Sequence, residues 1–214
     1  MSFIVESSGG NFERCPVGSH LARCYRIIGL GTQRSEYKGQ VKFLPKVMLG
    51  WEVHAFDEDG KPLNMADGRP FGIFKNYTLS WSEKATLRLD LQSWRGKPFT
   101  PEEMRRFDLA NIMDKWCLIN VVEREGQNGN LYSNVAGVMP VPAHLKQLGL
   151  PASVNQNEMF NILEPNMEMF NGFSENLKKK IEASPEWQKV LGKVAAQPGT
   201  VSQAASSEDD DIPF

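Results

Sequence analysis

The stretch from Val41 to Ala55 alternates between two kinds of side chain, and this pattern restricts the possible folds of the chain most strongly. A period of two is typical of a β-strand with one buried and one exposed face, so the chain must build a sheet that covers a core. Pro45 predicts a bulge or a sheet edge, because proline has no backbone N–H. The apolar side chains fall on the odd positions Val41, Phe43, Val47, Leu49, Trp51, Val53 and Ala55.

Further strands are predicted before and after this one. Alternation begins near Leu21, and strands are also expected over residues 71–79, 116–124 and 131–141. Between the last two, Asn128-Gly129 is the pair that most strongly favours a hairpin turn.

Helices are predicted between the third and fourth of these strands. Ser80 and Glu83 have the spacing of a capping box, and the helix that follows would bury Leu87, Leu91 and Trp94 on one face. A second helix start is predicted at Thr100, followed by Pro101 and by Glu103 at the third helical position.

The predicted order is therefore three strands, helices, and two strands. This order is found in the OB-fold, a five-stranded Greek-key barrel with its helix between strands three and four. Another small β-barrel or an α+β sandwich with the same elements is the alternative. We predict a mainly β fold with helices, of the OB type, over residues 1–150.

The composition changes after Pro142. Residues 151–191 are predicted to form an irregular or helical extension, with helix from Leu177 to Ala183 and a short second helix that Ser184 caps and Gly192 ends. Residues 192–214 are small and polar before a run of acids, which is typical of a flexible linker with a disordered tail.

The formal net charge of −2 conceals two opposite charges. Seven bases and one acid lie between Arg14 and Lys46, a net charge of +6, whereas residues 201–214 contain four acids and no base. Such a partition predicts a basic body with one partner and an acidic tail with another. A solvated basic face without a partner is the alternative for the first of these.

The acidic tail ends in Asp209, Asp210, Asp211, Ile212, Pro213 and Phe214. A solubilising tail explains the aspartates but not the apolar residues that follow them. As a ligand for another protein the segment is well built, because Phe214 can enter a pocket, its carboxylate can meet a cation, and the aspartates can steer the encounter.

This tail resembles that of bacterial single-stranded DNA-binding proteins. The body instead resembles single-stranded DNA-binding proteins encoded in phage and prophage replication modules, over about residues 10–142. The resemblance implies an OB-fold that coats single strands, and a tail that recruits host replication, recombination and repair proteins. The stretches that resemble this family are Ala22-Arg23-Cys24-Tyr25-Arg26-Ile27-Ile28, Lys75-Asn76-Tyr77-Thr78-Leu79-Ser80, Trp94-Arg95-Gly96-Lys97-Pro98-Phe99-Thr100 and Trp116-Cys117-Leu118-Ile119-Asn120-Val121-Val122.

Binding single strands without sequence preference requires cations for phosphates and aromatic faces for bases. The first strand is expected to place Arg23, Tyr25 and Ile27 on one face, opposite Cys24, Ile28 and Leu30. Phe43, Trp51, Trp81 and Trp94 are expected in the core. The candidate DNA-binding side chains are Arg23, Tyr25, Arg34, Tyr37, Lys38, Lys42, Lys46 and Tyr77.

No catalytic residue, cofactor or metal site is predicted. The three histidines are scattered, and no phosphate-binding loop or nucleophile motif occurs. Two alternatives remain: a recombination mediator or strand-annealing protein, and a metal-dependent nuclease that uses Asp57, Glu58 and Asp59.

The expected location is the cytoplasm of a bacterial host cell. Three cysteines without C-x-x-C spacing favour a reducing compartment, and the first residues do not have the pattern of a signal peptide. No apolar run is long enough for a membrane span. The predicted partners are single-stranded DNA, host proteins bound by the tail, and a possible second copy of the chain.

Overall fold

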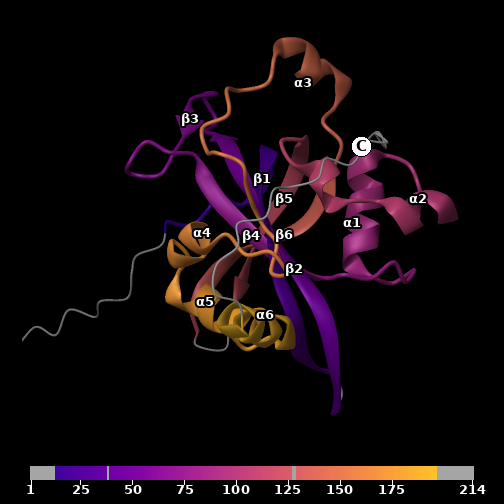
Figure 1. Ribbon diagram of the computed structural model, residues 1–214. Helices are drawn as coiled ribbons and strands as arrows, with labels where there is room; N and C mark the ends of the chain where they lie inside the picture. Colours follow the sequence, from indigo (N-terminus) through magenta and orange to yellow (C-terminus); the bar gives the residue numbers. More distant parts are fainter. Residues whose placement is uncertain (1–12, 38, 127–128, 197–214) are drawn as a thin grey trace, which may run out of the picture.

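The computed structural model describes residues 13–37, 39–126 and 129–196 (Figure 1). The fold is mainly β, with one sheet of seven strands and helices placed around it. The strands are β1 (Gly18–Tyr37), β2 (Gln40–Phe56), β3 (Pro62–Leu63), β4 (Phe71–Thr78), β5 (Trp116–Glu125), β6 (Leu131–Met139) and β7 (Glu158–Phe160). The helices are α1 (Thr86–Arg95), α2 (Pro101–Arg106), the 3-10 helix η1 (Leu109–Ile112), α3 (Ala143–Leu148), α4 (Met167–Asn171), α5 (Glu175–Glu182) and α6 (Pro185–Ala196).

The five long strands follow the order β4-β2-β1-β5-β6, and every pair in this series is antiparallel. Its two end strands approach each other, although no ladder joins β4 to β6 within the described residues. The sheet therefore curls on itself and remains open at one seam. α1 contacts both β4 and β6 beside this seam. In the sequence, α1, α2 and η1 lie between the third and fourth long strands, as predicted.

Two β-bulges in β1 change the direction of its side chains. The β1–β2 register advances by two residues on β1 but one on β2 between Cys24 and Arg26, and again between Gly29 and Gly31. A bulge inserts one extra residue and so reverses the alternation that follows it. The faces predicted for the first strand are therefore wrong: Ile27 shares the inner face with Cys24, not with Arg23.

The inner face of the curled sheet encloses the main hydrophobic core. Trp51 is completely buried there, and α1 adds Leu87, Leu91 and Trp94, as its periodicity predicts. The helix itself begins later than predicted, at Thr86. The capping box expected at Ser80 is wrong, because the Ser80 hydroxyl accepts from the N–H of Ser82 in a local turn (3.2 Å).

The capping box at Thr100 is confirmed. The Thr100 hydroxyl accepts from the N–H of Glu103 (3.2 Å), and the Glu103 carboxylate accepts from the N–H of Thr100 (2.8 Å). The predicted hairpin between β5 and β6 also forms, with Gly129 in the left-handed region at φ 76°, while Asn128 lies outside the described residues.

The C-terminal extension packs on the outer face of the sheet, where it makes a second hydrophobic cluster. β7 pairs in parallel with β1, with Phe160 opposite Ile28. Phe160, Phe170 and Trp187 pack around Ile28 and Leu30, and the rings of Phe170 and Trp187 stack with centroids 4.3 Å apart. α4 to α6 cover this face in the lower part of Figure 1.

The predicted helix over Leu177–Ala183 corresponds closely to α5, and Ser184 caps α6 by accepting from the N–H of Trp187 (3.3 Å). The expectation that Gly192 ends α6 is wrong, since that helix runs through to Ala196.

The ribbon formed by β1 and β2 extends beyond the rest of the sheet, at the bottom of Figure 1. β4 pairs with β2 only from Lys46 to Val53, so it does not reach the residues near the turn. Val41 and Phe43 are consequently 45% and 66% exposed. The prediction that Phe43 belongs to the core is therefore wrong. The odd positions from Val47 to Ala55 are buried as predicted, but Gly50 and Glu52 on the face predicted to be exposed are buried as well.

Candidate nucleic-acid interface

A groove of two adjoining hollows runs along β4. The first, of about 580 Å³, lies between β2, β4 and the chain that leads into α1. The second, of about 470 Å³, lies over the open seam between β4 and β6. Because Lys75, Asn76 and Thr86 line both hollows, we treat them as one feature, the β4 groove.

Basic side chains reach the β4 groove from three parts of the fold. Lys42 comes from β2 near its turn with β1, Lys84 from the segment before α1, and Arg124 from β5 near its turn with β6. All three are exposed. In the part of the chain that the structure describes, no carboxylate pairs with any of them, so their charges are free to meet an anionic ligand.

A fourth cation of the groove, Lys75, is already paired. Its ammonium donates to Asp90 Oδ2 at 2.7 Å, and the hydroxyl of Tyr77 donates to the same oxygen at 2.7 Å. Burial, together with the charge and the hydrogen bond of Asp90, raises the pKa of Tyr77 far above its ordinary value. These contacts fasten β4, whose Lys75 and Tyr77 line the groove, to α1.

Phe74 supplies an aromatic surface in the groove. Its side chain is 41% exposed and lies over Gly50 on the neighbouring strand, where a Cβ atom would come within 2.7 Å of the ring. The guanidinium carbon of Arg26 lies 5.5 Å from the centre of the Phe74 ring and 5.4 Å from that of Tyr25. Arg26 also pairs with Glu158 of β7 at 2.6 Å. The ring is therefore held in place while part of it remains open to solvent.

Three of the sequence-predicted side chains are buried. Arg23 is 2% exposed and its guanidinium is bound by Glu52, Asp114 and residues of the extension. Tyr25 and Tyr77 are 6% and 3% exposed. A base cannot stack on a ring that the protein covers, so neither tyrosine offers a stacking face, although Tyr77 is among the residues that line the first hollow. The Arg23 guanidinium is likewise covered and already bound.

The remaining predicted residues lie on or near the β1–β2 ribbon. Lys42 lines the groove and Lys46 is half-buried in β2. Arg34 is exposed and paired with Glu36 at 2.8 Å. Lys38 and the Tyr37 side chain lie outside the described residues, as do the tail residues Asp209, Asp210, Asp211, Ile212, Pro213 and Phe214.

Sequence reasoning missed Phe74, Lys84 and Arg124. Phe74 alternates with Ile73 in a predicted strand, so its outward position could have been found from the period of two. Lys84 lies in the segment between β4 and α1, and Arg124 lies near the end of β5, so only the fold shows that both segments line one groove.

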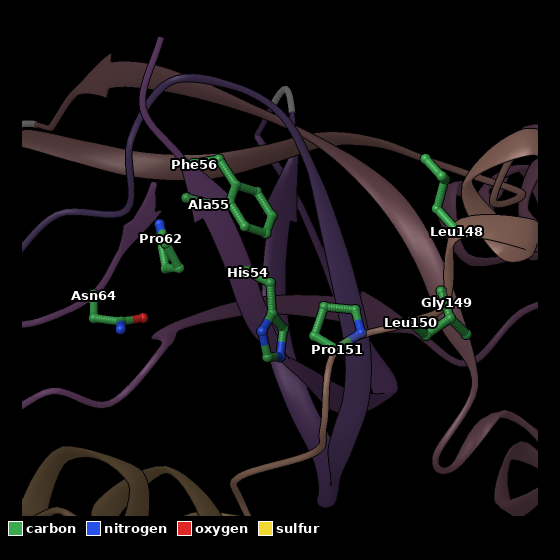
Figure 2. A pocket seen from close by; sticks show the side chains of 9 residues that line it. All are labelled: His54, Ala55, Phe56, Pro62, Asn64, Leu148, Gly149, Leu150 and Pro151. Carbon is green, nitrogen blue, oxygen red and sulfur yellow. The ribbon is translucent and has the colours of Figure 1, made fainter. Parts of the chain in front are cut away.

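A separate hollow of about 390 Å³ lies between the end of β2 and the chain after α3 (Figure 2). Its lining is largely apolar, and its only titratable side chain is His54, which forms a hydrogen bond with buried Glu52 at 3.1 Å. We assign no chemistry to this hollow.

The described residues contain no candidate metal-binding site. These hold no group of three or more histidine, cysteine, aspartate or glutamate side chains placed to bind one ion. Asp57, the first acid considered for a nuclease, accepts from the N–H groups of Asp59 (3.0 Å) and Lys61 (2.8 Å), and so fixes its own turn. Burial raises the pKa of Cys15 and Cys24 to about 12.

Within those same ranges, no helix combines the length and the apolar character needed to cross a bilayer.

Comparison with known proteins does not indicate a function. No protein-family model matches the chain, and a search of curated proteins finds no similar sequence.

Proposed function

We propose that this protein binds single-stranded DNA without sequence preference, through the β4 groove. The observation that supports the proposal most directly is the meeting of Lys42, Lys84 and Arg124, which no carboxylate of the described residues pairs, with the partly exposed ring of Phe74 along one groove. Cations that follow a backbone, combined with aromatic faces on which bases stack, are what such binding requires.

The position of the groove within the fold also supports an OB-type barrel. OB-folds bind oligonucleotides on the face of their second and third strands, between the loop joining strands one and two and the loop joining strands four and five. Here the groove follows β2 and β4, the second and third long strands. Lys42 and Arg124 lie toward the corresponding β1–β2 and β5–β6 turns.

The tail provides the second half of the proposed function. Asp209 to Phe214 would bind host replication, recombination or repair proteins and bring them to a coated strand, as the family resemblance implies. The body would thus hold DNA and the tail would hold proteins, in the cytoplasm of a bacterial host cell.

Fluorescence anisotropy with labelled oligo-dT at several salt concentrations tests the proposal. We expect the logarithm of the association constant to fall linearly with the logarithm of the salt concentration, with a slope of about −0.7 for each phosphate contact. Phe74→Ala should weaken binding about tenfold, because stacking on an aromatic ring is worth about 1–3 kcal/mol per base. Phe56→Ala removes a phenylalanine of similar exposure (45% against 41%) outside the groove and is the matched control.

The outcomes separate the competing functions. No measurable affinity for oligo-dT, or equal effects of the two phenylalanine substitutions, would contradict the proposal. Annealing of complementary strands by the purified protein would favour the recombination mediator instead, and sustained cleavage with Mg²⁺ or Mn²⁺ would favour the nuclease.

A further inference from the structure

The C-terminal extension places Lys180 beside the β1–β2 ribbon. The side-chain amide of Gln33 on β1 donates to the carbonyl oxygen of Lys180 on α5 at 2.8 Å and to that of Leu30 at 2.6 Å. This bridge fixes the end of α5 against the base of the ribbon.

Lys46 lies on β2, also at the base of the ribbon. It pairs with Gly31 across the β1–β2 ladder. Gly31 in turn touches the chain just after α5 so closely that a Cβ atom would be 2.6 Å from the side chain of Ser184. Lys46 and Lys180 are therefore neighbours, and burial together with the charge of Lys46 lowers the pKa of Lys180.

Three acidic residues of β1 and the extension, Glu36, Glu175 and Glu186, are already bound to other groups. Glu186 accepts from the N–H and hydroxyl of Thr32 at 2.8 and 2.6 Å, and Glu36 pairs with Arg34. Glu175 pairs with Lys178 at 3.2 Å. Among the described residues, neither Lys46 nor Lys180 forms an ion pair. Two like charges held together without a counter-charge favour the binding of an anion.

We propose that the backbone of bound single-stranded DNA continues from Lys42 in the β4 groove over Lys46 and onto Lys180, so that the extension is part of the DNA interface. This inference rests on the proposed function. Lys42 and Lys46 share β2, and the Gly31 partner of Lys46 adjoins the chain just after α5, so the three lysines follow one another from the sheet to the extension. α5 would then contribute phosphate contacts as well as packing.

Anisotropy titrations of Lys180→Gln, Lys46→Gln and the double variant with oligo-dT test the path. Each single substitution should weaken binding about fivefold at 0.1 M salt and reduce the salt slope by about 0.7, the contribution of one phosphate contact to a single strand. Lys180→Arg should retain both values. The matched control is Lys146→Gln, an exposed lysine on α3, which lies at the opposite end of the molecule in Figure 1.

Thermal unfolding without DNA distinguishes a binding role from a structural one. Lys180→Gln should leave the melting temperature unchanged or slightly raised, because the substitution removes a repulsion. If Lys180→Gln has the same DNA affinity and salt slope as the unaltered protein while Phe74→Ala binds DNA more weakly, this inference is overturned and the proposed function stands. Absence of binding by the unaltered protein would overturn both.

Discussion

The guanidinium of Arg23 binds the carboxylate of Glu52 through two hydrogen bonds of 3.1 Å, and both side chains are almost completely buried. Arg23 also donates to Asn157 (2.6 Å), and Glu52 also accepts from the N–H of Asn155 (2.7 Å). The pair therefore joins β1 and β2 to the start of the extension, which adds a polar attachment to the hydrophobic one around Phe160.

Replacing Glu52 with glutamine should strongly destabilise the fold. The substitution keeps the shape of the side chain but removes the charge opposite Arg23, and breaking a buried pair costs about 3–5 kcal/mol. Urea unfolding followed by circular dichroism measures the loss. Glu58→Gln, at an exposed turn, is the control and should change stability by less than about 0.5 kcal/mol. Equal stability of the two variants would show that the pair contributes nothing.

The same pair should make stability depend on acid pH. Burial opposes ionisation of Glu52, but hydrogen bonds from Arg23 and Asn155 prevail and lower its pKa from 4.5 to about 2. The unfolded chain therefore binds more protons than the folded chain in this range. The stabilisation from Glu52 should be complete above pH 4.5 and disappear as the pH falls toward 2. The difference in stability between the unaltered protein and Glu52→Gln should shrink over this interval, and a constant difference would contradict the assignment.

The strand pattern of β2 could be predicted because its core side chains follow a simple period. Trp51 and Val53 alternate with polar neighbours and are buried as expected. Phe43 fits the same period but is exposed, because whether a strand has a covering layer depends on how far β4 reaches. Alternation predicts which residues share a face, but not whether that face is covered.

The wrong predictions for individual site residues and strand faces have a different cause. Arg23 was predicted to bind DNA because it is a base on a strand, and its buried partners Glu52 and Asn157 are far away in sequence. The bulge at Tyr25 leaves no recognisable mark in the sequence, yet it reverses the direction of the side chains that follow it, up to the second bulge between Gly29 and Gly31. Phe160 and Trp187 have no common period, since they meet only after β7 has paired with β1.

The contact of Phe74 with Gly50 predicts a specific effect on DNA binding. Gly50→Ala would place a Cβ atom 2.7 Å from the ring and displace it, so oligo-dT binding should weaken by up to about tenfold. Gly72→Ala is the matched control, because its Cβ atom would meet the same ring at an ordinary 3.6 Å. Anisotropy titrations compare the two, and equal affinities would show that the position of Phe74 does not matter.

Gly31 should be essential for attaching the extension. Its φ of 66° disfavours other residues, and the side chain of Ser184 leaves no room for a Cβ atom. Gly31→Ala should cost about 3 kcal/mol in urea unfolding, of which the backbone conformation accounts for about 1 kcal/mol. Gly39→Ala isolates the backbone contribution, because Gly39 has a φ of 75° and no atom within 4 Å of the added carbon. Similar losses in both variants would rule out the close contact as a cause.

Removal of Asp209 through Phe214 should leave affinity for oligo-dT equal or higher. The lost segment contains three aspartates, whose carboxylates would compete with phosphates for the cations of the groove. A variant with asparagine at positions 209, 210 and 211 keeps the length and the apolar end, so its affinity should rise by a similar factor if charge is the cause. Both gains should fade as salt increases, because exposed charges are screened beyond about 10 Å at 0.1 M. Weaker DNA binding after truncation would mean that the tail contacts DNA directly, which is contrary to its proposed role as a ligand for proteins.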